Sequence, residues 1–362
     1  MIRLHVIPEG PAEGPVWGCG EIRLIRPLTH PTVARRFRVT VGRNMVLPSG
    51  RIDAVVTQRA ATVEATLDST LALVREVRRR RLPLVYDIDD DLLTRHPDFT
   101  ADTALATRRP QIRLLLREAD AVITSTPALA ERIRHINPRV SVWRNALDDS
   151  LILPMRSDWA SRNPRDLLYM GTVTHLPDLM SVVASLEANL APMDDKPTFD
   201  IVGISDDPRI SSLLARVCQT EIAPAITDYS GFLLGMQRRG AWRVGLAPLA
   251  PNVFNRCKSD IKFLDYAVIG AVGVYVDSPV YAAVRPGETG LLARREAFGE
   301  AVRELLQSPD VAARIRSQAR EYVLAERMLS ERASDLADLV EQALDGATIG
   351  RIASPLAVTS DP

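Results

Sequence analysis

Residues 247–267 read Ala-Pro-Leu-Ala-Pro-Asn-Val-Phe-Asn-Arg-Cys-Lys-Ser-Asp-Ile-Lys-Phe-Leu-Asp-Tyr-Ala. Three cations, Arg256, Lys258 and Lys262, fall within seven residues of this stretch. Cations placed where a loop enters a helix can bind a diphosphate. Asp265 comes three residues after the last cation, and a carboxylate there can accept hydrogen bonds from a sugar diol. The combination predicts a site for a nucleotide sugar.

Short apolar runs alternate with helix-like stretches along both halves of the chain. The expected strands are residues 3–7, 37–41, 53–57, 84–88, 121–124, 140–143, 167–170, 199–202, 244–248 and 272–276. The expected helices are residues 66–80, 112–118, 127–135, 176–190, 208–217, 261–269, 299–306 and a long one from about 311 to 344. Apolar strands that alternate with helices are typical of parallel sheets covered on both faces, so the pattern predicts an α/β fold.

Residues 148–165 interrupt this alternation. They are rich in Asp, Ser, Asn and Pro, which favour turns and linkers. The pattern predicts a first domain over residues 1–150, a linker over 151–165, a second domain over 166–345 and a flexible tail over 346–362. Two α/β halves joined by a linker leave a cleft, and ligands of open α/β sheets bind beyond the carboxyl ends of the strands.

The composition excludes several classes of protein. With 362 residues, 46% of them hydrophobic, the chain is long enough for two domains with a core in each. Its formal net charge is zero, which argues against a general nucleic-acid binder. Its cysteines, Cys19, Cys218 and Cys257, lie far apart, which fits a reducing compartment and neither a disulfide framework nor a zinc site.

Two features bear on location. The first residues do not form a signal peptide, and no run of about 18 apolar residues occurs, so we expect a cytoplasmic protein that is at most peripheral at the inner face of a membrane. Residues 75–81 and 108–117 carry clusters of arginine. Such clusters favour a solvated helix face, and the alternative is contact with an anionic membrane surface.

Six short blocks, in order along the chain, carry a resemblance to a known family. They are VYDIDDDL at 85–92, ADAVITST at 119–126, WRNALD at 143–148, LYMGT at 168–172, KFLDYA at 262–267 and GETGLL at 287–292. The chain resembles a GT-B fold glycosyltransferase of the retaining family 4 group, of the kind that builds bacterial cell-surface polysaccharides. The resemblance covers roughly residues 1–340. Two departures are Asp265, where the family has Glu, and Cys257, where the family has a second acid.

The resemblance implies two Rossmann-like domains that face a central cleft. The second domain would bind a nucleoside-diphosphate sugar and the first a glycan or lipid-linked acceptor. Family behaviour implies retention of the anomeric configuration and no required metal or other cofactor. An alternative is a non-catalytic GT-B scaffold, which the two departures make possible.

Within this frame, Arg256 and Lys262 are the expected catalytic residues, because fixed cations neutralise the charge that develops on a leaving diphosphate. Lys258 is expected to help bind the diphosphate, and Asp265 to bind the ribose of the nucleotide. The structural alternatives are a solvated basic helix start and a surface ion pair between Lys262 and Asp265 at i, i+3.

Small residues and one histidine complete the expected donor and acceptor contacts. Gly18 and Gly20 flank Cys19 after the first strand, where backbone N–H groups can approach a phosphate or sugar, although such loops are also common turns. Gly171 and His175 follow the strand that opens the second domain and are expected near the donor, the alternative for His175 being a capping or surface role.

Four acids lie at the end of the strand at residues 84–88: Asp87 within it, and Asp89, Asp90 and Asp91 directly after it. The Asp-x-Asp spacing also occurs in metal sites and in phosphatase nucleophile blocks, so a phosphatase-like hydrolase that uses Asp87 and Asp89 is an alternative function. In the GT-B frame, Asp89 is expected to bind acceptor hydroxyls. The structural alternative is that Asp89 or Asp90 caps the next helix. His96 is a candidate for the histidine that lies near the reacting sugar in retaining relatives.

Overall fold

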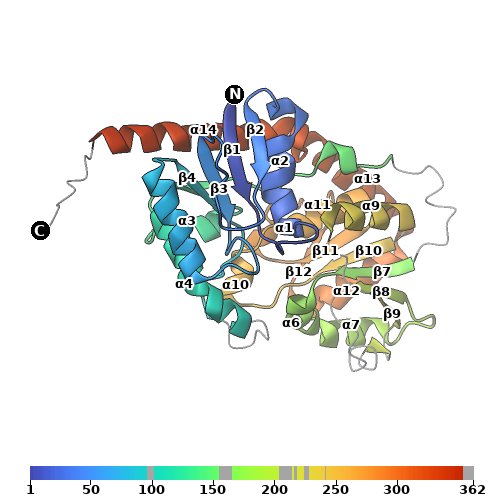
Figure 1. The fold of residues 1–362 in the computed structure, drawn as a ribbon. Helices are drawn as coiled ribbons and strands as arrows, with labels where there is room; N and C mark the ends of the chain where they lie inside the picture. The colour runs from blue at the N-terminus through green and yellow to red at the C-terminus, as the bar shows by residue number, and fades with distance from the viewer. Residues whose placement is uncertain are drawn as a thin grey trace, which may run out of the picture. The chain divides into compact units, whose positions relative to one another are not determined.

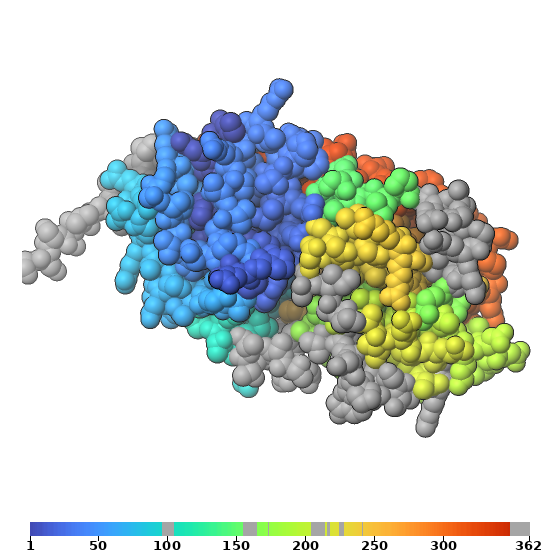
Figure 2. Space-filling model, turned by 45° about the vertical axis from the view of Figure 1, so that its right-hand side comes forward, coloured from blue at the N-terminus to red at the C-terminus, as the bar shows by residue number. Residues whose placement is uncertain are grey.

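The computed structural model describes residues 1–95, 102–154, 165–203, 214–215, 218–223, 228–240 and 242–353 (coloured in Figure 2). These residues divide into two compact units (Figure 1). Of the described residues, those within 1–95, 104–144 and 332–353 form unit 1, and those within 102–103 and 145–331 form unit 2. Each unit is built around its own sheet.

Unit 1 contains a six-stranded parallel sheet with the order β2-β1-β3-β4-β5-β6. The strands are β1 (Ile2–Ile7), β2 (Phe37–Val41), β3 (Ala54–Gln58), β4 (Leu84–Ile88), β5 (Ala121–Thr124) and β6 (Val140–Val142). The helices are α1 (Gly18–Gly20), the π-helical turn η1 (Glu21–Ile25), α2 (Arg26–Thr29), α3 (Leu67–Arg79), α4 (Asp102–Glu118) and α5 (Pro127–Ile133). Strands β3 and β4 are buried along their whole length, because helices cover both faces of a parallel sheet.

Unit 2 contains a second six-stranded parallel sheet with the order β12-β11-β10-β7-β8-β9. The strands are β7 (Arg165–Met170), β8 (Thr198–Val202), β9 (Gln219–Ala223), β10 (Trp242–Ala247), β11 (Val272–Val276) and β12 (Leu291–Ala293). The helical elements that concern the site are η4 (Val173–His175), α6 (Leu176–Met180), α7 (Val183–Leu190), α9 (Tyr229–Arg239), α10 (Val253–Arg256) and α11 (Ile261–Ile269). Helices α12 (Phe298–Gln307) and α13 (Pro309–Glu326) follow.

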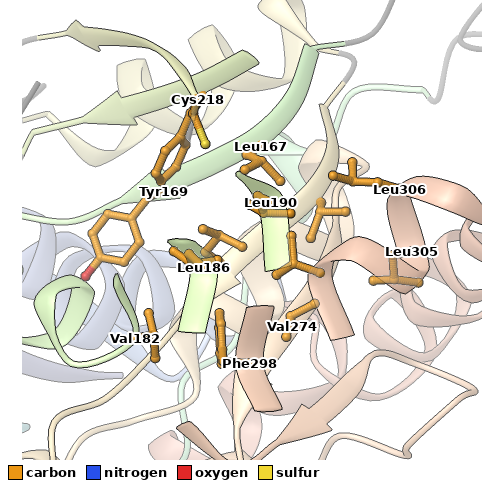
Figure 3. Close-up of a cluster of buried hydrophobic side chains, with 14 of the residues drawn as sticks. Leu167, Tyr169, Val182, Leu186, Leu190, Cys218, Val274, Phe298, Leu305 and Leu306 are labelled. Atoms are coloured by element: carbon orange, nitrogen blue, oxygen red, sulfur yellow. The ribbon is translucent and has the colours of Figure 1, made fainter. Parts of the chain in front are cut away.

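The core of unit 2 lies between this sheet and the helices α7 and α12. Leu186 of α7, Phe298 of α12 and Val274 of β11 meet there with at most 1% of their surface exposed (Figure 3). Gly299 lets the two helices approach closely, since a Cβ atom there would lie 2.0 Å from the carbonyl oxygen of Ser185. Tyr169 lies at the edge of this cluster, and its hydroxyl points away from the other labelled side chains (Figure 3).

The expected strands are present, and the structure adds β9, whose sequence QTEIA carries little apolar signal, and β12, an apolar segment of only three residues. The single helix expected over residues 176–190 is two helices, α6 and α7, with a turn at Ser181 and Val182. The helix expected over residues 208–217 lies almost wholly outside the described residues, and so does most of the expected linker. None of the helices in the described part of the chain combines the length and hydropathy of a membrane-spanning segment.

The long C-terminal helix expected from about 311 to 344 is also two helices, α13 and α14 (Leu329–Ala353). The break lies at Arg327 and Met328, where Met328 forms a parallel β-bridge with Leu147. The Arg327 guanidinium donates to both carboxylate oxygens of Asp260 at 2.8 and 2.9 Å and to the Asn145 carbonyl at 2.9 Å. Backbone bonds to Leu147 replace the continuation of the helix, because the Leu147 N–H donates to the Arg327 carbonyl at 2.9 Å and the Leu329 N–H donates to the Leu147 carbonyl at 2.8 Å.

All of α14 from Arg332 onward belongs to unit 1, whereas the sequence predicted that the second domain extends to residue 345. Arg36 pairs with Asp338 and Glu341 at 2.6 Å each, and the Trp143 indole donates to the Arg332 carbonyl at 3.0 Å. Contacts between residues that are far apart in the sequence thus decide to which unit the last helix belongs. The first unit ends near residue 144 before the chain returns to it at 332.

Arg327→Met is expected to lower the free energy of unfolding by about 3–5 kcal/mol, because it leaves the buried Asp260 carboxylate without its cation. Arg239→Met removes a cation that is 45% exposed and lies 3.2 Å from Glu221 and 3.9 Å from Asp200, which keeps its pair with Arg165, so it is expected to cost less than about 1 kcal/mol. Urea denaturation followed by circular dichroism measures both. Equal losses in the two variants would contradict a structural role for the buried pair.

Candidate active site

The carboxyl end of β7 opens the candidate site in unit 2. Gly171 follows the strand, and a Cβ atom there would lie 3.0 Å from the Cβ of His175 and 3.3 Å from Cε1 of Tyr169. A glycine therefore lets the chain fold closely over itself and bring His175 back beside the strand end. The Tyr169 hydroxyl donates to the His175 carbonyl at 3.1 Å and closes this turn.

Asp178, in α6, connects three elements through one buried carboxylate. Its Oδ1 accepts from the Ala250 N–H at 2.9 Å and from the Asn255 side-chain amide at 2.6 Å, and its Oδ2 lies 2.9 Å from Nδ1 of His175. Burial alone would raise the pKa of Asp178, but the bond with His175, the charge of Lys262 and the Ala250 N–H outweigh burial and hold the pKa below its ordinary value. Asp178 is thus held as a carboxylate.

The two lysines predicted for the diphosphate lie close to this network. Lys262, in the first turn of α11, places its Nζ 4.4 Å from the centroid of the Tyr169 ring and 3.4 Å from the Tyr169 hydroxyl. Lys258 places its Nζ 4.4 Å from the centroid of the Phe254 ring. Burial and the charge of Lys258 lower the pKa of Lys262 to about 8, against the opposing effect of Asp178 and Asp265.

His175 lies among these charges with 17% of its side chain exposed. Burial and then the charges of Lys258 and Lys262 lower its pKa to about 3, while the bond to Asp178 acts in the opposite direction. The imidazole is therefore neutral at physiological pH. His175 is the end residue of η4 and precedes α6 without capping it by a side-chain hydrogen bond, so the capping alternative is not what the structure shows.

Asp265 lies one turn after Lys262 in α11 and is 6% exposed. Its Oδ1 accepts from the Tyr229 hydroxyl at 2.8 Å. Burial raises the pKa of Asp265 to about 7, and the Tyr229 hydroxyl and Lys262 oppose the rise. The residue is thus a buried acid held by α9, and the alternative of a surface ion pair with Lys262 is wrong.

Arg256 ends α10 and its side chain is exposed, so it is the most solvated of the three cations in this segment. Lys258 and Lys262 are partly buried. The structure thus brings together His175, Gly171 and the two lysines, and places Arg256 at the surface beside them in the sequence. Its expected catalytic role stays a prediction.

In unit 1, Gly18 and Gly20 form the first turn of a helix and not a loop. A Cβ atom on Gly20 would lie 2.4 Å from Cγ1 of Val16 and 2.9 Å from Cβ of Pro8. Glycine at this position is therefore required by close packing of the segment that follows β1. A contact of Gly18 or Gly20 with substrate stays a prediction.

The four acids at the end of β4 and directly after it are held by cations of unit 1. Asp87 is fully buried and pairs with the fully buried Arg23 at 2.7 Å. Asp89 and Asp90 both pair with Arg59, which also contacts Glu9 at 2.9 Å. Asp91 pairs with Arg132 at 2.9 Å and accepts from Thr94, which forms a turn.

These pairings bear on two of the sequence alternatives. Asp89 and Asp90 do not cap a helix, since residues 89–95 form a loop and α4 begins at Asp102. Asp87 is enclosed by Arg23 and by the Gln58 amide at 3.0 Å, so it is not placed as an exposed nucleophile for a hydrolase. Within the described ranges, no group of three or more His, Cys, Asp or Glu side chains could hold a metal ion. His96 lies outside the described residues.

The basic cluster at residues 75–81 is largely used within the fold. Arg79 and Arg80 pair with Glu76, and Arg78 pairs with Glu118 and Asp120. These ion pairs reduce the net positive charge that α3 presents. The structure therefore favours a solvated helix face, the structural reading of this cluster.

Comparisons with known proteins agree with this architecture. Residues 3–145 match the model of the glycosyl transferase 4-like domain. Sucrose-phosphate synthase from Thermosynechococcus elongatus is similar over 95% of this chain and 100% of its own, with 15% identity and a TM-score of 0.66. Alr3699/HepE from Anabaena, solved with UDP-glucose, is similar over 94% and 100%, with 14% identity and a TM-score of 0.64. A glycosyltransferase from Rickettsia africae is similar over 95% and 98%, with 12% identity and a TM-score of 0.59.

The solved structures show that the fold is GT-B, with two Rossmann-like α/β units. The family match shows the class: residues 3–145 are a glycosyl transferase 4-like domain, and the chain is a glycosyltransferase. No curated protein sequence matches the chain.

Sequence reasoning missed the residues that assemble the site. Asp178 bonds to Ala250 and Asn255, which follow it by 72 and 77 residues, and Tyr229 bonds to Asp265 across 36 residues. Only the position of Asp178, three residues after His175, carried a signal, because that spacing brings two side chains together at the start of a helix. Nothing in the local sequence connects the other partners.

Asp265→Asn is expected to change how stability depends on pH. The folded pKa of Asp265, about 7, lies above its ordinary value of 3.8, so the wild-type protein loses stability as pH rises from about 4 to 7. The variant retains the acceptor for Tyr229 and has no carboxyl group that must ionise. Its free energy of unfolding relative to that of the wild type should therefore increase as pH rises from about 4 to 7, by at most about 4 kcal/mol. Melting temperatures from pH 4.5 to 8.5 measure the difference.

Asp277→Asn, which replaces an exposed carboxylate in the same unit, is the control, and its melting curve is expected to run parallel to that of the wild type. A constant offset between Asp265→Asn and the wild type across the whole pH range would show that Asp265 is ionised in the folded protein throughout.

Proposed function

We propose that unit 2 binds a nucleoside-diphosphate sugar and that the enzyme transfers this sugar to a glycan or lipid-linked acceptor. The observation that supports the proposal most directly is the pair Lys258 and Lys262 beside the turn of Gly171 and His175, at the carboxyl end of β7. Ligands of parallel sheets bind at this edge. The Anabaena protein of similar fold was solved with UDP-glucose and with UDP and glucose.

In the proposed reaction, the bond between the anomeric carbon of the sugar and the diphosphate oxygen breaks. The electron pair leaves with the diphosphate, while the oxygen of the acceptor hydroxyl forms the new bond and its proton passes to the departing diphosphate or to water. Lys262 and Lys258 are placed to stabilise the charge of the leaving diphosphate, since fixed cations in a partly buried site need little reorganisation during the reaction. Arg256 contributes a further, more solvated charge.

Asp265 is proposed to bind the ribose. Its Oδ1 is held by Tyr229, and its Oδ2 has no hydrogen-bond partner among the described residues, so this oxygen is available to a ribose hydroxyl. The shorter side chain of Asp, compared with the Glu of the family, is compensated in this proposal by the Tyr229 hydroxyl, which orients the carboxylate from α9.

Several finer features belong to the same proposal. The acceptor is proposed to bind to unit 1 near Asp89, where Asp89, Asp90 and Arg59 are 14–20% exposed at the carboxyl ends of β3 and β4. Retention of configuration, independence of metal ions and a role in surface polysaccharide synthesis follow from the family resemblance. Membrane contact through residues 75–81 receives no support from the ion pairs of α3.

A thermal-shift screen against UDP, GDP, dTDP, ADP and CMP, with and without EDTA, tests the donor site. We expect one nucleotide to raise the melting temperature by mass action, in an EDTA-insensitive manner. Lys262→Ala is expected to weaken the binding of that nucleotide by about tenfold to a hundredfold, the usual range for the loss of a hydrogen bond to a charged group. Arg256→Ala should have the smaller effect, because its side chain is solvated.

Arg239→Ala, an exposed cation of α9 in the same unit, is the control and is expected to leave the shift unchanged. The proposed donor site would be contradicted if no nucleotide raised the melting temperature. It would also be contradicted if Lys262→Ala showed the same rise as the wild type.

Nucleotide affinity is also expected to fall as pH rises above about 8, because Lys262 then loses the proton that makes it a cation. Lys262→Arg retains a permanent charge, so its affinity should stay nearly constant from pH 7.5 to 10. Isothermal titration calorimetry across this range measures both proteins. If the affinity of Lys262→Arg fell with pH as much as that of the wild type, the pH dependence would come from a group other than Lys262.

A further inference from the structure

We propose that His175 presents its Nε2 atom as a hydrogen-bond acceptor for a hydroxyl group of the donor, and that Asp178 is the positioning residue that fixes the imidazole in this form. The inference rests on the proposed function of the same site and extends it by naming which part of the donor His175 recognises.

The contacts of Asp178 show which nitrogen of the His175 ring carries a proton. Its Oδ1 accepts from two nitrogen donors, Ala250 N–H and the Asn255 amide. A carboxylate is an acceptor only, so the His175 nitrogen that lies 2.9 Å from Oδ2 must carry a proton. Nδ1 is therefore the donor, and the bond to Asp178 fixes both the tautomer and the orientation of the ring.

The second nitrogen then carries a lone pair, because the ring is not doubly protonated. Among the described residues, the charged and titratable groups near His175 are Asp178 on α6, Lys258 after α10, Lys262 on α11 and the Tyr169 hydroxyl at the end of β7. Two ammonium groups and burial disfavour a third positive charge, and a single carboxylate opposes them. Nε2 has no hydrogen-bond partner among the described residues, so it is available to a ligand.

The Nε2 lone pair and the two lysines are suited to different groups of the donor. The oxygens of an ionised diphosphate accept hydrogen bonds and cannot donate one, so they pair with Lys258 and Lys262 and not with Nε2. A hydroxyl group can donate to Nε2. His175 is thus suited to a hydroxyl of the ribose or of the transferred sugar, which share this chemistry, while the lysines hold the phosphates.

The first experiment measures the tautomer directly. In ¹⁵N-detected NMR spectra of the imidazole rings, His175 is expected to show a pyrrole-type shift for Nδ1 and a pyridine-type shift for Nε2 from pH 5 to 8. Its signals are assigned by their loss in His175→Asn. Asp178→Asn keeps the two acceptor bonds of Oδ1 but replaces the acceptor at Oδ2 by an NH₂ donor, so the two shifts should exchange. An imidazolium pattern at pH 7, or no exchange in Asp178→Asn, would overturn the proposal.

The second experiment separates the groups of the ligand. Affinities of the wild type and of His175→Asn are measured for inorganic pyrophosphate, for UDP and GDP, and for UDP-glucose and GDP-mannose. Asn at this position can keep the bond to Asp178 through its amide and lacks any atom at the place of Nε2. His135→Asn, an exposed histidine of unit 1, is the control and should change nothing.

Pyrophosphate, which has no hydroxyl group on carbon, should bind both proteins within about twofold, whereas a ligand whose hydroxyl contacts Nε2 should bind His175→Asn about tenfold more weakly. A loss for UDP or GDP indicates the ribose, and a loss only for the sugar nucleotide indicates the transferred sugar. Equal weakening of pyrophosphate would make His175 part of the phosphate site, and unchanged affinities would remove it from the donor site. Both results overturn the inference and leave the proposed function standing, while a wild type that binds none of these ligands contradicts both.

Discussion

The site in unit 2 depends on one buried carboxylate. Asp178 accepts three hydrogen bonds, from the turn after β7, from the loop after β10 and from α10. The energy of each such bond is modest in isolation, but an unpaired buried carboxylate would be costly, so the three donors must be in place together. Through this requirement a single side chain fixes the distance between the Gly171 turn and the segment that carries Lys258 and Lys262.

The same chemical groups have different roles in the two units because their partners differ. In unit 1, Asp87 is enclosed by Arg23, and Asp89 and Asp90 share Arg59. These carboxylates are satisfied by cations of the fold. In unit 2, the Lys262 ammonium lies over the Tyr169 ring, and burial, together with the charge of Lys258, lowers its pKa to about 8 against the effect of Asp178 and Asp265. A cation in such a place favours an anionic ligand, which is the property that a glycosyltransferase requires at its leaving group.

Much of the fold could be predicted from the sequence, because apolar runs such as residues 84–88 and 272–276 form buried parallel strands and the alternation with helices has a local cause. The division of the C-terminal region could not. A continuous helix fits the pattern across Arg327, but the backbone of Arg327 and Leu329 bonds to Leu147, and the Arg327 guanidinium bonds to Asp260 and Asn145. The ion pairs of Arg36 then hold the following helix in unit 1.

For the candidate site, the sequence by itself determined the class of chemistry: cations before a helix, a carboxylate one turn later, and a glycine and a histidine after a strand. These are properties of short segments, so composition and spacing reveal them. The tertiary structure alone decided which atoms are available. It buried Asp265 against Tyr229, paired Asp87 with Arg23, and gave Asp178 partners 72 and 77 residues away. Protonation and hydrogen bonding depend on the groups that surround an atom in space, and those groups come from segments whose separation along the chain has no bearing on their separation in the fold.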